Sequence, residues 1–199
     1  MARRRGASSC GGGRRVGKIR VLQDASAPVN SVDFPASKIS VTTIDKALHT
    51  TQMTVPREWL DYNEHMNVAY YTLAFDLAGE ELLKVAGMGE AYTQATKNSW
   101  MVVESHITYQ NEARLGDTLT IQSRVLDCAN KAAHLYQEMF RGEQLLATEE
   151  QLMLHVSLVT RGATPFEPAV LAALQAMQAL QQDMPRPDWV GRQIAIRRS

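Results

Sequence analysis

The stretch "DYNEHMNVAYYTLAFDLAGEELLKVAG", residues 61–87, joins a polar segment directly to a long apolar one. Its apolar residues recur at spacings of three and four, at Val68, Tyr71, Phe75, Ala78, Leu82 and Val85. This is the pattern of one face of an α-helix. A second apolar stripe lies beside the first, at Tyr70, Leu73, Ala74 and Leu77. Together the stripes predict a helix that is buried on most sides and ends at Gly87, since glycine suits the position just past a helix.

Extended segments follow this helix along the chain. After a linker at residues 88–99, four β-rich segments come in succession, at residues 100–115, 118–128, 131–140 and 144–159. Residues 50–56 alternate and stop at Pro56, which predicts an earlier strand, while residues 40–44 are too short to assign. Residues 166–182 have the pattern of an amphipathic C-terminal helix. One buried helix followed by four long strands predicts an α+β fold, with an antiparallel sheet wrapped around the helix.

Composition limits the class of protein. The chain has 199 residues, a formal net charge of zero and 45% hydrophobic residues, which predicts one core domain with tails. No apolar run approaches the roughly 18 residues that a membrane-spanning helix needs, so no membrane partner is expected. The cysteines, Cys10 and Cys128, are far apart and match no ligand or redox spacing, which suits a reducing cytoplasm.

The first 20 residues, "MARRRGASSCGGGRRVGKIR", are rich in arginine and glycine and contain no acid. Such a segment cannot bury enough apolar surface to order itself, so residues 1–47 are expected to be a disordered basic leader. It is open to three interpretations: an arm that contacts nucleic acid or a membrane surface, an organelle transit peptide, or a start codon set too early. We favour the last and expect no nucleic-acid partner.

The polar segment before the helix has two interpretations. Asp61 or Asn63 would cap a helix that starts near His65, which is worth about 1 kcal/mol and implies no activity. Alternatively, the three side chains form a compact set of acid, amide and imidazole, because alternate positions of an extended segment share one side. Such a set at the positive end of a buried helix suits attack on a carbonyl group. The pattern alone does not choose between them.

Several segments resemble one family. "DYNEHMNVAYY" resembles the Asp-x-Asn-x-His-x-Asn signature that starts the central helix of hotdog-fold thioesterases, in the superfamily of 4-hydroxybenzoyl-CoA and acyl-ACP thioesterases. "ESHITYQNEARLGDTLTI" resembles the following strand pair with its Gly-Asp turn, and "LLATEEQLMLHV" the last strand. The tail "MPRPDWVGRQI" resembles the end of the betainyl-CoA thioesterases of carnitine catabolism. The resemblance implies a hotdog domain at residues 48–160, followed by a C-terminal helix and tail at residues 161–199.

The resemblance implies a catalytic role for the polar set in hydrolysis of an acyl-CoA thioester, with no cofactor. Asp61 would be the general base on water, or the nucleophile through a mixed anhydride. Asn63 would position the water or the thioester carbonyl. His65 would polarise the carbonyl or orient Asp61. Asn67 is a candidate substrate-binding residue, expected in the first helical turn and packed against a neighbouring subunit rather than acting as a reacting group, because hotdog domains generally assemble as dimers or tetramers.

Other candidates for substrate binding depend on residue type. A betainyl group carries a quaternary ammonium, which aromatic faces bind by cation–π attraction, so Trp59, Tyr62 and Trp100 are candidate cage residues. Ordinary core or interface packing is the alternative for each of them. Glu104 is a candidate second acid, or a carboxylate that simply pairs with a base or faces solvent. Three histidines fall on separate predicted strands: His106, His134 and His155. They show no metal-ligand spacing, so no metal site is expected.

The sequence therefore predicts an acyl-CoA thioesterase, with betainyl-CoA as the favoured substrate and glycine betaine and CoA as products. The first alternative is a thioesterase for another short or aromatic acyl-CoA. A hotdog dehydratase fits less well, because the motif resembles the hydrolase signature. A non-catalytic acyl-CoA-binding protein is the alternative from a different class. The presence of all of Asp61, Asn63 and His65 argues against it, since a pure binder needs no such set.

Overall fold

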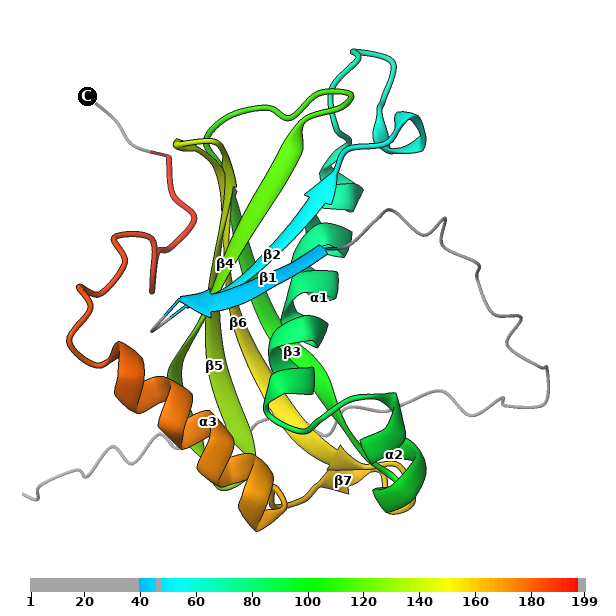
Figure 1. Cartoon of the computed structure of the whole chain (residues 1–199), viewed down its shortest axis with the longest axis vertical. Helices are drawn as coiled ribbons and strands as arrows, with labels where there is room; N and C mark the ends of the chain where they lie inside the picture. The colour runs from blue at the N-terminus through cyan, green and yellow to red at the C-terminus, as the bar shows by residue number, and fades with distance from the viewer. Residues whose placement is uncertain (1–39, 46–47, 197–199) are drawn as a thin grey trace, which may run out of the picture. The chain divides into compact units, whose positions relative to one another are not determined.

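A long antiparallel sheet curls around one central helix (Figure 1). The computed structural model describes residues 40–45 and 48–196, so the expected leader lies outside the described residues except for its segment 40–45. The elements in chain order are β1 (Ser40–Asp45), β2 (Leu48–Thr54), the 3-10 turn η1 (Arg57–Trp59), α1 (Val68–Val85), α2 (Glu90–Thr96), β3 (Asn98–Tyr109), β4 (Thr118–Ala129), β5 (Ala132–Arg141), β6 (Gln144–Ser157), β7 (Gly162–Ala163) and α3 (Pro168–Gln181). The predicted α+β hotdog architecture is confirmed.

The strand order is β1-β2-β4-β5-β6-β3, with every neighbouring pair antiparallel and β7 beside the end of β6. Although β3 and β4 follow each other in sequence, they are not partners. β3 instead pairs with β6, so the segment expected as a strand pair around the Gly-Asp turn crosses from one side of the sheet to the other. β3 thereby becomes the last strand of this order, at the opposite end from β1.

The predicted central helix is confirmed over residues 68–85. Its C-terminus is closed by two backbone bonds, from Met88 N–H to Leu83 O at 2.8 Å and from Gly87 N–H to Lys84 O at 3.0 Å. This is the Schellman arrangement, and it requires a left-handed residue at position 87, where glycine has φ 87°. The predicted end of the helix at Gly87 is confirmed, because glycine reaches this conformation without a steric penalty.

The core lies between α1 and the concave face of the sheet. Phe75 and Ala78 of α1 are fully buried against Ile121 and Met139 of the central strands. A second apolar cluster at the other end of α1 takes in the C-terminal helix and consists of Leu82, Leu83, Ala86, Met88, Val125, Ala133, Leu135, Met153, Phe166, Val170 and Leu174. The helix predicted at residues 166–182 is therefore part of the packed unit, and its buried side is the side that meets β4.

Three short elements differ from the sequence-based prediction. The linker at residues 88–99 contains α2, which has no buried residue and so no periodic apolar stripe to reveal it. Residues 40–45 form β1 within the range expected as the leader, and β7 has two residues. β3 ends at Tyr109 rather than residue 115, because residues 110–117 form the connection to β4. Among the described residues, no helix combines the length and the apolar character that crossing a bilayer requires.

Candidate active site

The segment between η1 and α1 folds as a tight turn. Leu60 and Met66 form an isolated antiparallel bridge that closes it. Inside the bridge, Asp61 N–H donates to His65 O at 2.9 Å and Glu64 N–H donates to Asp61 O at 3.2 Å. Glu64 has φ 62°, the left-handed conformation that a chain reversal of this kind uses. The expectation that this segment is extended was wrong, so alternate spacing does not by itself place its side chains on one side.

The Asp61 carboxylate helps to hold this turn. Its Oδ1 accepts the backbone N–H of Asn63 at 2.8 Å and that of His65 at 3.4 Å. Within the part of the chain that the structure describes, Oδ2 accepts no hydrogen bond. Neither Asp61 nor Asn63 caps the helix, because the N-cap is Asn67, whose side chain accepts Ala69 N–H at 3.0 Å. The carboxylate is thus oriented by its own turn, with one oxygen available for chemistry.

The imidazole of His65 is held by a residue from another part of the chain. Its Nε2 lies 3.3 Å from Oε2 of Glu112, in the connection between β3 and β4. The Arg114 guanidinium donates to the same carboxylate and holds the pKa of Glu112 below its usual range. The bonds between His65 and Asp61 are made through the His65 backbone, so Glu112 rather than Asp61 orients the ring.

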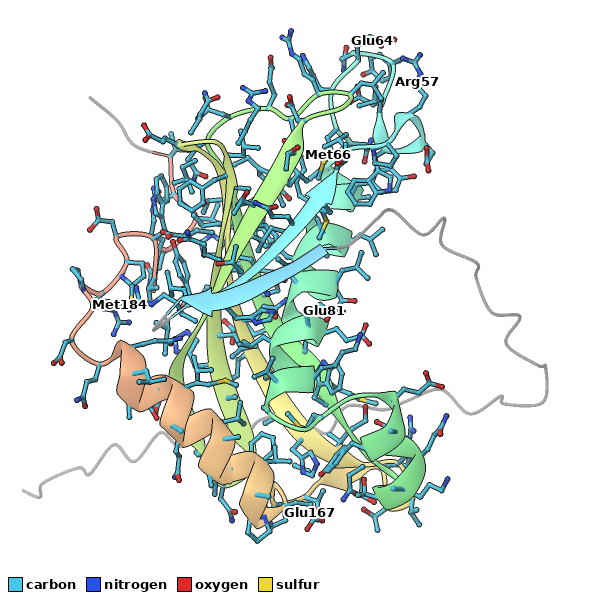
Figure 2. All side chains as sticks on the ribbon, in the orientation of Figure 1. Arg57, Glu64, Met66, Glu81, Glu167 and Met184 are labelled. Carbon is cyan, nitrogen blue, oxygen red and sulfur yellow. The ribbon has the colours of Figure 1, made fainter. Side chains whose placement is uncertain are left out.

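Backbone bonds anchor the turn to its neighbours. Met66 N–H donates to Ala113 O at 2.8 Å, and Asn67 N–H donates to Trp59 O at 2.9 Å. Arg57 and Glu64 pair at 2.9 Å at the outer end of the turn (Figure 2). Both of these side chains are exposed, so the pair adds little stability. The backbone bonds, and not the surface pair, fix where the polar set lies relative to α1.

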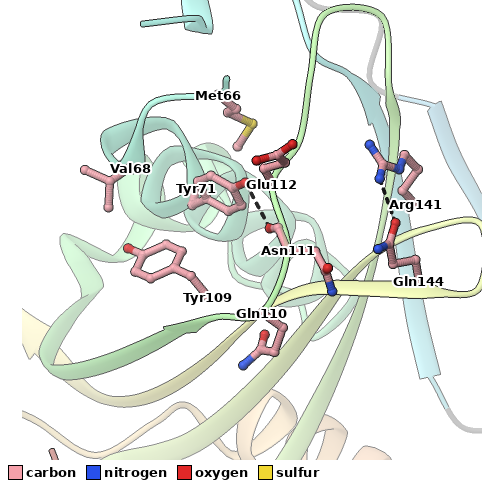
Figure 3. Close-up of a pocket in the computed structure, with 9 residues that line it drawn as sticks. All are labelled: Met66, Val68, Tyr71, Tyr109, Gln110, Asn111, Glu112, Arg141 and Gln144. Carbon is pink, nitrogen blue, oxygen red and sulfur yellow. Dashed lines mark hydrogen bonds between the residues drawn. The ribbon is translucent and has the colours of Figure 1, made fainter. Parts of the chain in front are cut away.

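A pocket of about 600 Å³ opens beside the first turn of α1 (Figure 3). It is lined by Met66, Val68, Tyr71, Tyr109, Gln110, Asn111, Glu112, Arg141 and Gln144. Met66 is the chain neighbour of both His65 and Asn67, so the pocket adjoins the polar turn. Arg141 donates to Asp117 at 2.6 Å, which matches its positive charge with a carboxylate. The pocket can therefore receive the part of a substrate that extends from a carbonyl group held at the turn.

The aromatic residues expected as a cage are not brought together. Trp59 is buried and stacks on Tyr70, with ring centroids 5.4 Å apart and planes at 10°. Tyr62 is 94% exposed at the tip of the turn. Trp100 lies near the start of β3, opposite His155, and packs against the second apolar cluster, far along the strand from Tyr109. Sequence proximity to Asp61 placed two of the three in the same loop, but the turn points them in different directions.

Glu104 lies on the face of the sheet turned away from α1. Strand alternation sets this, because Ser105, its neighbour, donates to the buried carboxylate of Glu149 at 2.7 Å on the inner side. On the outer side, Glu104 lines a separate cavity with His106 and with the His134–Glu150 pair, whose Nε2 and Oε1 are 2.8 Å apart. Within one protomer, the structure therefore does not bring Glu104 to the polar turn.

Sequence reasoning missed the residues that line the pocket. Tyr71 was placed only in the apolar stripe of the helix, and Tyr109 and Glu112 received no role. Tyr71 OH accepts Ala113 N–H at 2.9 Å and donates to Asn111 O at 3.4 Å, across about 40 residues of chain. The sequence offers one signal for them, a polar break after an apolar strand at residues 110–112. Nothing in that break shows that it meets α1.

Comparisons with known proteins agree with this geometry. The sequence model of the thioesterase-like superfamily matches residues 55–174. The chain is 31% identical over 155 residues to a betainyl-CoA thioesterase of Pseudomonas aeruginosa, a match that covers 77% of this chain and 98% of that protein. It is 30% identical over 188 residues to an L-carnitine dehydrogenase/betainyl-CoA thioesterase of Ruegeria pomeroyi, covering 90% of this chain but only 38% of that longer protein.

Solved structures share the fold. A hypothetical protein of Staphylococcus aureus, determined in complex with CoA, superposes with a TM-score of 0.73 at 25% identity, covering 78% of this chain and 99% of that one. A candidate thioesterase of Pseudomonas putida KT2440 gives a TM-score of 0.65 at 28% identity, covering 74% and 95%.

Proposed function

Because the chain belongs to the thioesterase-like superfamily, we propose that it hydrolyses acyl-CoA thioesters and that betainyl-CoA is its substrate. The observation that carries the reaction is the Asp61 carboxylate, held by Oδ1 in a turn that runs directly into the N-terminus of α1. In the reaction, water adds to the thioester carbonyl and the C–S bond breaks, which gives the free acid and CoA. The polar turn and the start of α1 supply the groups that water addition and C–S cleavage need.

Asp61 is the general base that takes a proton from the attacking water. The N-terminus of α1 carries a partial positive charge that stabilises the oxygen of the tetrahedral intermediate, while the N–H groups of Ala69 and Tyr70 already bond to Asn67. Asn63 positions the water, and His65, oriented by Glu112, polarises the thioester carbonyl. In the alternative, Asp61 attacks the thioester carbonyl itself and the C–S bond breaks to release CoA, and water then hydrolyses the mixed anhydride to the free acid and the Asp61 carboxylate.

The proposed substrate has less support than the reaction. The Pseudomonas aeruginosa relative, which the chain matches over nearly its whole length, is named for betainyl-CoA. The relatives that join this activity to a carnitine dehydrogenase are longer proteins, of which the chain spans about a third. A different short or aromatic acyl-CoA is the alternative substrate, and a hotdog protein that binds acyl-CoA without cleaving it is the alternative function.

We further propose that two chains pair along β3. β3 is the end of the described strand order, so one of its edges offers backbone groups without a strand partner. The strand also exposes Met101, Val102 and Val103. Apolar side chains on an unpaired edge favour addition of a second strand, and a second copy of β3 would continue the sheet.

The test is thiol release from a panel of acyl-CoA esters, including betainyl-CoA, by the wild type and two variants. Asp61→Asn keeps an oxygen that accepts the two turn N–H groups but removes the base, so kcat should fall at least about 100-fold with the melting temperature nearly unchanged. Asp61→Ala should lose activity and also stability, because two N–H groups of the turn lose their acceptor.

The outcomes separate the candidates. Release from betainyl-CoA by the wild type, lost in Asp61→Asn, supports both the reaction and the role of Asp61. Release from other esters alone keeps the thioesterase and rejects the betainyl substrate. Binding of acyl-CoA without release of thiol identifies a binding protein.

A further inference from the structure

Two aromatic faces meet at a corner in the pocket beside α1. Tyr71 comes from the first turn of the helix and Tyr109 from the end of β3, with ring centroids 5.2 Å apart and planes at 87° (Figure 3). Tyr71 is buried and Tyr109 is 49% exposed. In this edge-to-face arrangement a group in the pocket can contact both rings. A stacked pair would present one ring to it.

The tyrosine on the helix side of the corner is held in place. The Tyr71 hydroxyl accepts Ala113 N–H and donates to Asn111 O, so the ring is fixed between α1 and the loop after β3. Burial raises the pKa of Tyr71 and of Tyr109, so both remain neutral phenols near neutral pH. The two rings therefore contribute electron-rich faces without a formal charge.

A carboxylate completes this part of the pocket. Glu112 lies beside the Tyr71 ring, and the guanidinium of Arg114 keeps it ionised (Figure 3). Arg141 also lines the pocket, where its charge is paired with Asp117 as that of Glu112 is paired with Arg114, and it acts on both Glu112 and Tyr71. Met66 and Val68 add apolar surface. Aromatic faces, methyl groups and one carboxylate suit a cation that carries methyl groups and has no N–H to donate.

We propose that Tyr71, Tyr109 and Glu112 form the subsite that recognises a quaternary ammonium on the acyl group of the substrate. The assignment rests on the proposed function, because it requires a thioester carbonyl bound at the adjoining turn. In a betainyl group the ammonium is separated from the carbonyl carbon by a single methylene, so its subsite must adjoin the catalytic turn. The pocket meets this requirement through Met66, whereas Trp100, at the other end of β3, does not.

The test compares betainyl-CoA with 3,3-dimethylbutanoyl-CoA, its uncharged isostere, in which carbon replaces the ammonium nitrogen. Their ratio of kcat/KM reads the charge of the acyl group and little else. Tyr109→Leu removes the ring and should lower the ratio about tenfold, as loss of a cation–π contact predicts. Tyr109→Phe is the matched control, since it keeps the ring face and should keep the ratio within about threefold.

Glu112→Gln gives an independent reading. It removes the negative charge and also the partner of His65, so kcat should fall for both esters while the ratio falls as well. A ratio that stays at the wild-type value in both Tyr109→Leu and Glu112→Gln, while rates on the two esters fall together, overturns the subsite. If Tyr109→Leu does not fold, the Glu112→Gln ratio decides alone.

Failure of the subsite can be told from failure of the proposed function. A wild type that cleaves the uncharged isostere at least as well as betainyl-CoA overturns the subsite and leaves the thioesterase intact. A wild type that releases CoA from neither ester, nor from any other in the panel, overturns both.

Discussion

At the scale of single residues, Asp61 divides its two oxygens between structure and chemistry. One oxygen accepts two backbone N–H groups of the turn, and the proposed reaction uses the other. Asp61→Asn separates these roles, because an amide oxygen still accepts hydrogen bonds but is no base. A carboxylate that were only structural would tolerate this change without loss of kcat.

Glu149 is a second carboxylate with an unusual setting. It is fully buried on β6, and its Oε2 has no hydrogen-bond partner among the described residues. Burial, with a smaller contribution from the charge of Asp76, raises the pKa of Glu149 to about 7, against the opposing effect of hydrogen bonds from Ser105 and Gln151. Tyr109 is the other titratable group that interacts with it. The pKa of Glu149 in the folded protein is therefore close to neutral pH.

Stability should therefore depend on pH through Glu149. In the unfolded chain its pKa is near 4.5, so between about pH 4.5 and 7 the unfolded state loses a proton that the folded state keeps. The free energy of unfolding should fall across this window, by up to about 3 kcal/mol, and level off above it. Urea denaturation of the wild type and Glu149→Gln from pH 4 to 8 measures the difference.

The glutamine variant should lack this fall. Ser105→Ala should extend the window to higher pH, because it removes a bond that favours the ionised carboxylate. Parallel pH profiles for the wild type and Glu149→Gln would contradict the assignment of a raised pKa to this residue.

At the scale of elements, α1 is defined by its two ends. Gly87 closes the C-terminus by its left-handed conformation, and Asn67 caps the N-terminus with its side-chain oxygen. Sequence analysis expected Asn67 in the first helical turn, one position further along than the structure places it. The polar signature before the helix thus contains both a cap and a candidate catalytic set, carried by different residues.

Asn67→Ala should lower the free energy of unfolding by about 1 kcal/mol, because Ala69 N–H loses its acceptor. Asn67→Asp is the matched control, since aspartate also caps and its charge suits the helix N-terminus. Chemical denaturation and kcat/KM are measured on the same preparations. A large fall in activity with unchanged stability would show that Asn67 acts on the substrate rather than on the helix.

At the scale of the molecule, the strand order leaves β3 at an edge. Both edges of β4 are paired, with β2 and β5, so among the described strands β3 has only β6 as a partner. Its exposed residues Met101, Val102 and Val103 lie on this edge strand, which is the basis for the proposed pairing of two chains.

Sedimentation equilibrium should give a mass of twice the 22.1 kDa of the chain. Lysines at positions 101 and 103, in Met101→Lys with Val103→Lys, should shift the mass toward the single chain, because two charges at a strand edge oppose pairing. The matched control is Val85→Lys with Leu180→Lys, which places the same charges on exposed apolar positions of α1 and α3 rather than on β3. A wild type of single-chain mass, or equal effects of the two double variants, would contradict pairing through β3.

Local patterns made much of the fold predictable. The helix at 68–85 and the strands from residue 118 onward follow from apolar spacing and turn residues that lie within a few positions of each other. α2 escaped prediction because it buries nothing, and the partner of β3 escaped because strand order is not encoded locally. For the site, the motif before α1 could be recognised from the sequence. Its conformation could not be predicted, since an Asx-type turn and an extended segment can have the same residue composition.

The sequence by itself determined where the central helix ends, which segments from residue 118 to 157 are strands, and that an acid, an amide and an imidazole precede the helix. Periodicity and capping act between neighbours in the chain, so they can be read from the chain. Only the tertiary structure decided that Tyr71 meets Tyr109, that Glu112 holds His65, and that Trp100 lies far from both. These contacts join segments about 40 residues apart, and they exist because β3 pairs with β6 and returns to the start of α1.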